Sequence, residues 1–251
     1  LNGVLAVYKP KGVTSAQFLD KIKFKIINAA FGPDTRPSSK GKHKKTNKLL
    51  KMGHGGTLDP MAEGVLVIGL GSGCKRMADF LSGSKEYQFE LLLGDHYDTF
   101  DCTGKLLESK PFDHVTPDTV TRQIIPRFTG EIMQRPPLYS AIRVNGKRAH
   151  SLAREQSENG EILDELAARP VTVHSLTLDA FDLPRLQMTA AVGGGCYIRS
   201  LCVDMANSMG TVGTMSKLLR SKQGSFSLND CVRMFDDGEQ VDLDLLKSLL
   251  K

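Results

Sequence analysis

The order of apolar patterns along the chain is the feature that most constrains its fold. Segments typical of strands occupy residues 1–8, 65–68, 87–93, 171–178 and 186–192. Helical spacing begins after Thr14, a good N-cap, and fades near Asn28, and a second helical stretch covers residues 198–209 before Gly210. Because strand and helix patterns mix without strict alternation, we expect an α+β fold with a mostly antiparallel, mixed sheet flanked by helices.

Three shorter signals add elements to this outline. Residues 75–81 are predicted to be helical. Thr116 followed by Pro117 predicts the start of another helix, because threonine caps well and proline suits the first helical position. Asn145-Gly146 predicts the turn of a hairpin after residues 139–144, since this pair supplies the positive φ angles of a type I′ turn.

Composition excludes several classes of protein. The chain has 251 residues, of which 40% are hydrophobic and 24% charged, as is ordinary for a soluble globular protein. There is no apolar run of about 18 residues that would predict a membrane span. The five cysteines are odd in number and never spaced as C-x-x-C, so we expect reduced, mostly buried thiols in an intracellular protein rather than a disulfide framework or zinc site.

The positive charge is concentrated in one segment. Net charge is +5, but residues 36–51 alone carry +7 without an acidic residue, so the remainder of the chain sums to −2. A local basic run suits contact with nucleic-acid phosphates. A solvated loop or a nuclear localisation signal is the alternative. The cations of this run are Arg36, Lys40, Lys42, Lys44, Lys45, Lys48 and Lys51.

The most unusual stretch of the sequence is Met-Gly-His-Gly-Gly-Thr-Leu-Asp-Pro-Met-Ala-Glu-Gly-Val-Leu at residues 52–66. Three glycines before Asp59-Pro60 predict a rigid, irregular loop rather than a helix or strand. The residue before a proline is kept out of the helical region, which restricts how Asp59 presents its carboxylate. On the residues alone, Asp59 could be a turn residue and His54 a hydrogen-bonding loop residue.

This stretch resembles the catalytic loop of the TruB family of tRNA pseudouridine synthases. The resemblance extends over nearly the whole chain, through further blocks in the family's order. These blocks are residues 3–15 (GVLAVYKPKGVTS), 84–87 (SKEY), 134–141 (QRPPLYSA), 146–149 (GKRA), 169–173 (RPVTV) and 194–201 (GGCYIRSL). The resemblance implies the pseudouridine synthase fold and a single catalytic domain over residues 1–251, with a basic insertion at about 28–51.

The resemblance also implies roles for individual residues. Asp59 would be the catalytic aspartate, Tyr87 would stack on the target base, and Arg199 would pair with Asp59. Tyr197 and Leu218 would line the pocket, and His54 would fill the space that the uridine leaves in the loop stack. Lys9 is added to the substrate-binding residues, and Lys40, Lys42, Lys44 and Lys45 are assigned to the RNA backbone.

The implied reaction is isomerisation of uridine 55 in the T loop of tRNA, without a guide RNA. Uracil must detach from C1′, rotate and rejoin through C5, which requires a nucleotide flipped out of the stack. A guanidinium beside the carboxylate favours the ionised form that such chemistry needs. Whether Asp59 attacks the sugar, attacks the base or abstracts a sugar proton is left open. No cofactor or metal is implied, and the glycine-rich segment 69–75 fits neither a dinucleotide fingerprint nor a P-loop.

Two departures from bacterial members shape the remaining expectations. We expect no RNA-binding PUA domain after residue 251. The basic insertion resembles that of eukaryotic members, and we expect it to supply part of the affinity for RNA. The expected partner is the tRNA T stem-loop, with mRNA hairpins of T-loop-like shape as a further substrate class. We expect a monomer without membrane contact, in the nucleus or mitochondrion if the source is eukaryotic and in the cytoplasm otherwise.

Two rival functions stay open from sequence. One is an RNA-binding or RNA-folding factor in which catalysis is secondary. The other is a synthase that acts mainly on messenger or mitochondrial RNA, since substrates that share a T-loop-like fold cannot be separated by sequence.

Overall fold

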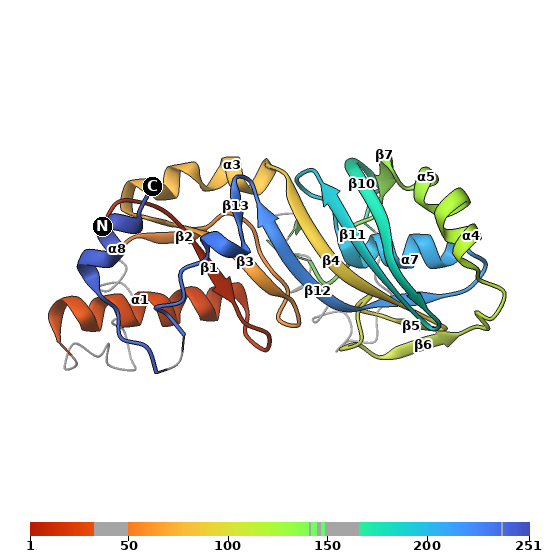
Figure 1. Cartoon of the computed structure of the whole chain (residues 1–251), viewed down its shortest axis with the longest axis horizontal. Helices are drawn as coiled ribbons and strands as arrows, with labels where there is room; N and C mark the ends of the chain where they lie inside the picture. The colour runs from red at the N-terminus through yellow and green to blue at the C-terminus, as the bar shows by residue number, and fades with distance from the viewer. Residues whose placement is uncertain (33–49, 141, 145–146, 149–165, 237) are drawn as a thin grey trace. The chain divides into compact units, whose positions relative to one another are not determined.

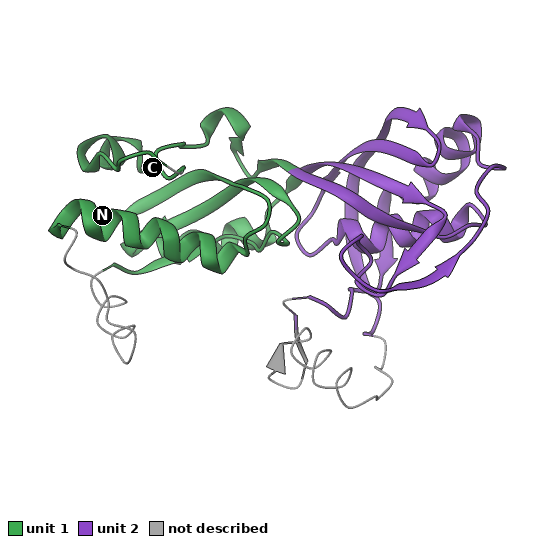
Figure 2. Ribbon diagram, turned by 90° about the horizontal axis from the view of Figure 1, so that it is seen from below, with its two compact units in different colours: residues 1–85, 220–251 green, residues 86–219 purple. Residues whose placement is uncertain are grey.

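The structure is a computed structural model that describes residues 1–32, 50–140, 142–144, 147–148, 166–236 and 238–251. The chain forms two compact units, coloured separately in Figure 2. Unit 1 comprises Leu1–Lys85 and Arg220–Lys251, and unit 2 comprises Glu86–Leu219. The expectation of a single catalytic domain over residues 1–251 stays a prediction.

Unit 1 contains both ends of the chain (Figure 2). Its sheet has β3 between β1 and the end of β12, with β2 also pairing β3 and β13 pairing β12. Strand β1 is antiparallel to β3, from Gly3 opposite Leu70 to Lys9 opposite Gly64. Its elements are β1 (Gly3–Lys9), α1 (Ser15–Phe31), β2 (Met52–His54), β3 (Glu63–Leu70), η1 (Gly71–Arg76), α3 (Met77–Ser82), residues 220–223 of β12, β13 (Phe226–Ser227), η3 (Leu228–Asp230) and α8 (Leu243–Leu249).

The sheet of unit 1 is buried on both faces, which explains why its strands read as continuous apolar runs. One face packs against the apolar stripe of α1 and against α8 (Figure 1), through Leu5, Val7, Phe18, Ile22, Ile26, Leu66, Ile68 and Leu246. The other face packs against α3 and β13, through Val4, Ala6, Val65, Val67, Met77 and Phe226. Strands β1 and β3 therefore form a rigid base for the loop that joins β2 to β3.

Unit 2 has its own part of the sheet, with the order β12, β4, β11, β10 and β7. Strand β10 is antiparallel to both β11 and β7. The elements are β4 (Lys85–Leu93), β5 (Asp95–Tyr97), β6 (Leu106–Ser109), α4 (Pro117–Thr119), η2 (Val120–Ile124), α5 (Ile125–Arg127), β7 (Gly130–Gln134), β8 (Arg143–Val144), β9 (Lys147–Arg148), β10 (Arg169–Asp182), β11 (Arg185–Val192), α7 (Ile198–Ser208) and β12 (Gly213–Gln223).

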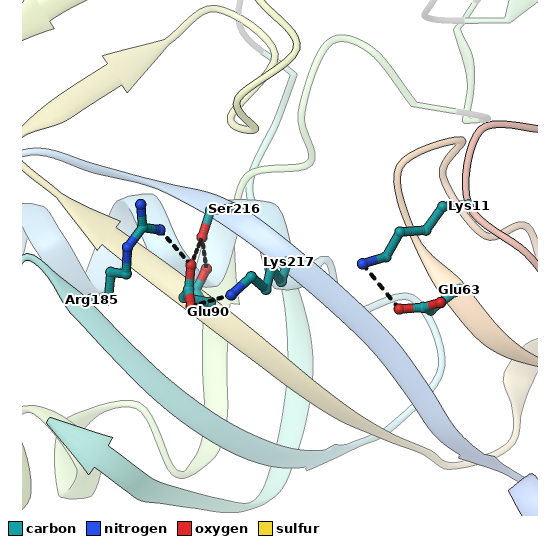
Figure 3. Close-up of polar contacts among 6 residues, drawn as sticks. All are labelled: Lys11, Glu63, Glu90, Arg185, Ser216 and Lys217. Carbon is teal, nitrogen blue, oxygen red and sulfur yellow. Dashed lines mark hydrogen bonds and ion pairs between the residues drawn. The ribbon is translucent and has the colours of Figure 1, made fainter. Parts of the chain in front are cut away.

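A buried carboxylate ties three strands of unit 2 together (Figure 3). Glu90 of β4 is only 3% exposed. It accepts hydrogen bonds from Arg185 of β11 at 2.6 Å and from Ser216 and Lys217 of β12 at 2.7 and 2.8 Å. Burial alone would raise the pKa of Glu90, but these three donors outweigh it and lower the pKa to about 2.

Most predicted elements are confirmed. The α+β class with a mainly antiparallel sheet is as expected, and so are the five strand regions. Thr14 caps α1 in a capping box with Gln17, although the helix continues to Phe31, three residues beyond the expected end at Asn28. Gly210 follows α7 with φ of 77°, as a left-handed helix stop requires.

Other predictions are only partly right. The helix expected over residues 75–81 begins as the 3₁₀ helix η1 and becomes α-helical only at Met77. Thr116 caps a helix as expected, but that helix passes into a π-helical turn at Val120. The hairpin strands β8 and β9 are present, while their turn residues lie outside the described residues.

Two expectations drawn from composition have separate outcomes. The five cysteines are free, but the expectation that most are buried is wrong, because only Cys202 is buried and Cys102 is exposed. Within the described part of the chain, no helix is long and apolar enough to cross a membrane.

Candidate functional site

The loop that carries Asp59 connects β2 to β3 in unit 1 (Figure 1). It leaves the sheet at Gly55, whose N–H donates to Val67 O at 2.8 Å, and it turns where Ala62 N–H donates to Asp59 O at 3.1 Å. Gly55 cannot be replaced without a shift, because a Cβ there would lie 2.4 Å from the Cβ of Phe80. The irregular loop predicted from the glycines and Asp59-Pro60 is present at residues 55–62, but the prediction is wrong for Met52–His54, which form the strand β2.

The opening block of the sequence holds this loop from the other side. Ser15, at the start of α1, accepts a hydrogen bond from Leu58 N at 2.9 Å and donates to Leu58 O at 3.0 Å. Gly12 N donates to Pro60 O at 2.8 Å. Leu58 itself is 2% exposed. The residues on both sides of Asp59 are therefore fixed, while the Asp59 side chain is half-buried and accessible.

Lys9 lies beneath the loop rather than on the surface. It is fully buried, and its ammonium donates to Ala62 O at 2.7 Å and to Pro10 O at 2.9 Å. Burial lowers the pKa of Lys9 to about 8, against the opposing attraction of Asp59. In this placement the Lys9 ammonium supports the loop through Ala62 O, and the expectation that Lys9 binds substrate stays a prediction.

A second polar group flanks the loop where β3 begins. Tyr8 donates to Glu63 Oε2 at 2.8 Å, and Lys11 is paired with Glu63 at 3.0 Å (Figure 3). Burial and the hydrogen bond to Glu63 raise the pKa of Tyr8 to about 12. Burial would raise the pKa of Glu63, but the bonds from Tyr8 and Lys11 prevail and lower it. Glu63 is thus an ionised carboxylate bonded to Tyr8 and Lys11.

His54 ends β2, opposite Ile68 of β3, and is half-buried. Its position one residue before the glycine pair places it at the entry of the Asp59 loop. The expected role of His54 in the RNA loop stack stays a prediction.

The other residues assigned to the base pocket belong to unit 2. Tyr87 lies near the start of β4 and is 7% exposed, and Leu218 on β12 is 6% exposed. Both strands belong to the same sheet and are neighbours in its order. An aromatic ring and an aliphatic side chain on adjacent strands suit the wall of a pocket for a flat base.

Tyr197 is held at the N-cap of α7. Gln134 at the end of β7 accepts from Tyr197 N at 2.8 Å and donates to Tyr197 O at 3.1 Å. The guanidinium of Arg169 lies over the Tyr197 ring, 5.7 Å from its centroid. Tyr197 is therefore fixed by two segments that the sequence had singled out only as matching blocks.

Arg199 is the best-anchored of the predicted residues. It is 4% exposed, and its terminal nitrogens donate to Thr99 O at 2.9 Å and to Tyr139 O at 2.8 Å. Arg199 thus links the loop after β5 with the segment after β7. The prediction that it also pairs with Asp59 joins residues of different units and stays a prediction.

Sequence reasoning assigned no part to several residues that support these positions. Gln134 contacts Tyr197, Thr99 contacts Arg199, and Ser15 contacts Leu58 next to Asp59. Arg220 and Gln223 contact the Asp59 loop from β12. Ser15 and Gln134 belong to matching blocks of the sequence, whereas Thr99, Arg220 and Gln223 lie outside these blocks. The four lysines assigned to the RNA backbone lie outside the described residues.

Comparison with known proteins identifies the family. Residues 43–198 match the family model described as TruB family pseudouridylate synthase (N terminal domain). The chain belongs to the TruB family. It is 44% identical over 230 residues to Pseudouridylate synthase TRUB1 of Homo sapiens, and 35% identical over 240 residues to tRNA pseudouridine synthase B of Clostridium tetani. These alignments cover 92% and 96% of this chain.

The TruB relatives are longer than this chain. The alignments span 63% of the human protein and 74% of the clostridial one. Among solved structures, the chain is similar to one in the crystal structure of a Cbf5-Nop10-Gar1 complex, with a TM-score of 0.59 and 26% identity. That match covers 90% of this chain and 50% of the other. The pseudouridine synthase fold expected for a TruB protein is therefore confirmed.

Proposed function

We propose that the protein is a tRNA pseudouridine synthase that isomerises uridine 55 of the T loop, with Asp59 as the catalytic carboxylate. The observation that carries this proposal is the Asp59 loop. The Ser15 hydroxyl, which accepts from Leu58 N and donates to Leu58 O, and the Gly12 N–H, which donates to Pro60 O, fix the residues on either side of a half-buried aspartate. The nearby Glu63 is bonded to Tyr8 and Lys11, and the motif that resembles the TruB catalytic loop points to Asp59 rather than Glu63 as the reactive carboxylate.

The reaction requires no net change in composition. The N1–C1′ glycosidic bond breaks, the base turns, and C5 forms the new bond to C1′. The proton on C5 is lost, and N1 ends protonated. These steps need a carboxylate near C1′, a wall that holds the free base, and exclusion of water. Asp59, Tyr87 and Leu218 have the chemistry for the first two tasks, provided that the target nucleotide is flipped out of its stack.

Family membership supports tRNA as the substrate class, since relatives of this chain bear the name tRNA pseudouridine synthase B. The solved structure compared above is a complex of Cbf5 with Nop10 and Gar1. For this chain we propose action without a guide RNA, because it is 35% identical to a tRNA pseudouridine synthase B and only 26% identical to the chain of the Cbf5 complex.

A site-mapped pseudouridine assay tests this proposal. The purified chain is incubated without other RNA or protein with a tRNA transcript, the same transcript with cytidine at position 55, and an mRNA hairpin of T-loop-like shape. We expect one pseudouridine at position 55 of the first RNA and none in the second. Binding without product would favour an RNA-folding factor, and a higher kcat/KM on the mRNA hairpin would favour the messenger-RNA alternative.

A further inference from the structure

Arg220 is a buried cation with an unusual set of partners. It lies in β12, within the part that belongs to unit 1, and is 1% exposed. Its Nε donates to Val65 O at 2.7 Å, one terminal nitrogen to Gly56 O at 3.2 Å, and the other to Thr57 O at 3.5 Å. Among the described residues these acceptors are all backbone carbonyls, and none is a carboxylate.

Such an arrangement costs stability. A buried charge that is bonded only to neutral groups recovers less of its hydration energy than one paired with an opposite charge, and an apolar side chain would avoid the cost. Two further cations lie nearby, since the charge of Arg220, after burial itself, helps to lower the pKa of Lys9 and of Lys85 to about 8. A buried cation that lowers stability calls for another explanation, and the carbonyls that Arg220 binds indicate one.

Gln223 continues the same row of contacts. Its side-chain N–H donates to Gly55 O at 2.7 Å, and its side-chain oxygen accepts from Val67 N at 3.0 Å. Two residues of one strand therefore bind the carbonyls of Gly55, Gly56 and Thr57 in succession. A Cβ at Gly55 or Gly56 would lie 3.3 Å from Gln223 Nε2, so the glycines permit this close approach.

We propose that Arg220 and Gln223 are positioning residues that fix the backbone before Asp59 and thereby the direction of its carboxylate. This inference rests on the proposed catalytic role of Asp59. The planar guanidinium suits the task because its donors diverge at fixed angles toward carbonyls in different peptide planes, which a lysine ammonium on a flexible stem cannot reproduce. A displacement of about 1 Å at a reacting group can cost about 100-fold in rate.

The test compares Arg220→Lys and Gln223→Met with the wild type, using Thr214→Val as the matched control. Thr214 is also fully buried in β12 but belongs to unit 2. Single-turnover pseudouridine formation on tRNA gives the rate constant at saturating RNA and the half-saturating concentration. Hydrogen exchange of a peptide covering residues 52–62 reports on the loop itself, and calorimetry reports on folding.

We expect Arg220→Lys to lower the saturating rate constant at least 30-fold and Gln223→Met about 10-fold, with half-saturating concentrations within threefold of wild type. Loop exchange should accelerate in both variants and stay unchanged in Thr214→Val. A saturating rate within threefold of wild type in both variants would overturn the inference, and so would a loss confined to RNA affinity. If Arg220→Lys fails to fold, the result for Gln223→Met tests the positioning role by itself, since that substitution leaves the buried charge unchanged.

The same experiment separates this inference from the proposed function. If Asp59→Asn remained active, the catalytic assignment would fall, whatever the loop exchange shows. If Asp59→Asn is inactive and the loop loosens in both variants without a change in rate, the assignment of Asp59 survives and only the positioning role is overturned.

Discussion

At the scale of single residues, Arg199 connects two segments that are distant in sequence. Its two terminal nitrogens reach carbonyls that are 40 positions apart in the chain, at Thr99 and Tyr139. Neither acceptor is charged, so the role of the side chain depends on the direction of its donors as well as on its charge. A buried guanidinium bonded in this way is pre-organised before RNA binds.

Arg199→Lys should therefore be nearly as damaging as Arg199→Ala. A lysine keeps the positive charge but lacks the planar fork of diverging donors that reaches both carbonyls in their present positions, and each buried carbonyl left without its donor costs about 1–3 kcal/mol. The measurement is kcat/KM for pseudouridine formation in both variants, and we expect the two values to agree within about threefold. Near-normal activity of Arg199→Lys would show that charge alone is sufficient.

Among the helices and strands, the sequence predicted those whose burial or capping leaves a pattern in their own residues. Strands β1 and β3 were recognised because both faces are buried, and α1 because Thr14 caps an evident apolar stripe. The 3₁₀ start of the segment at Gly71 and the π turn at Val120 were missed, because they depend on tertiary packing rather than on local propensity.

Prediction of the candidate site shows a similar division. Asp59 and the loop followed from a motif, whereas Arg220 and Gln223 are far from that loop in sequence and only the fold brings them to it. The sequence alone does not predict whether Lys9 is buried or exposed. Contacts between residues that are distant in sequence leave no local pattern from which they could be predicted.

Strands β4, β11 and β12 are linked through Glu90, and that link should depend on pH. The lowered pKa of Glu90 means that its contribution is fully present above the ordinary value of 4.5 and is lost as pH falls toward about 2. The lowered pKa corresponds to a contribution of at most about 3 kcal/mol to the free energy of unfolding. We expect Glu90→Gln to lower the free energy of unfolding at pH 7, and the gap from wild type to shrink between pH 4.5 and 3. Urea unfolding at pH 7, 5, 4 and 3 measures this gap.

The matched control for Glu90 is Glu108→Gln. Glu108 pairs with Lys110 at 2.9 Å, but both side chains are about half exposed, and such pairs contribute about 0–1 kcal/mol. The free energy of unfolding of Glu108→Gln should differ little from that of the wild type at every pH. A gap for Glu90→Gln that stayed constant from pH 7 to 3 would contradict the assignment.

At the scale of the whole molecule, the residues assigned to catalysis are divided between two units. Asp59 and His54 belong to unit 1, and Tyr87, Tyr197, Arg199 and Leu218 to unit 2. The basic run at residues 36–51 adds +7 to a chain whose remainder is −2, so it accounts for the positive net charge. We propose that this run contacts tRNA phosphates without selecting sequence, since it has no Phe, Tyr or Trp for base stacking.

Deleting residues 38–47 tests that proposal, because it removes Lys40, Lys42, Lys44 and Lys45 and leaves the Asp59 loop intact. If two or three of these lysines neutralise phosphates, the slope of log affinity against log salt should flatten by about 2. Binding titrations between about 50 and 200 mM salt measure the slope, and the single-turnover rate at saturating RNA should change little. An unchanged slope would identify the run as a linker or an import signal instead.

The central claim is that Asp59 performs the chemistry, and the most direct measurement is pseudouridine formation at position 55 of tRNA by Asp59→Asn and Asp59→Ala. We expect both variants to lose turnover by at least 1,000-fold, an order of magnitude in keeping with the loss of a single essential catalytic group. Their affinity for tRNA should stay within about threefold of wild type, because the loop is held by its backbone. Turnover within tenfold of wild type in Asp59→Ala would contradict the account.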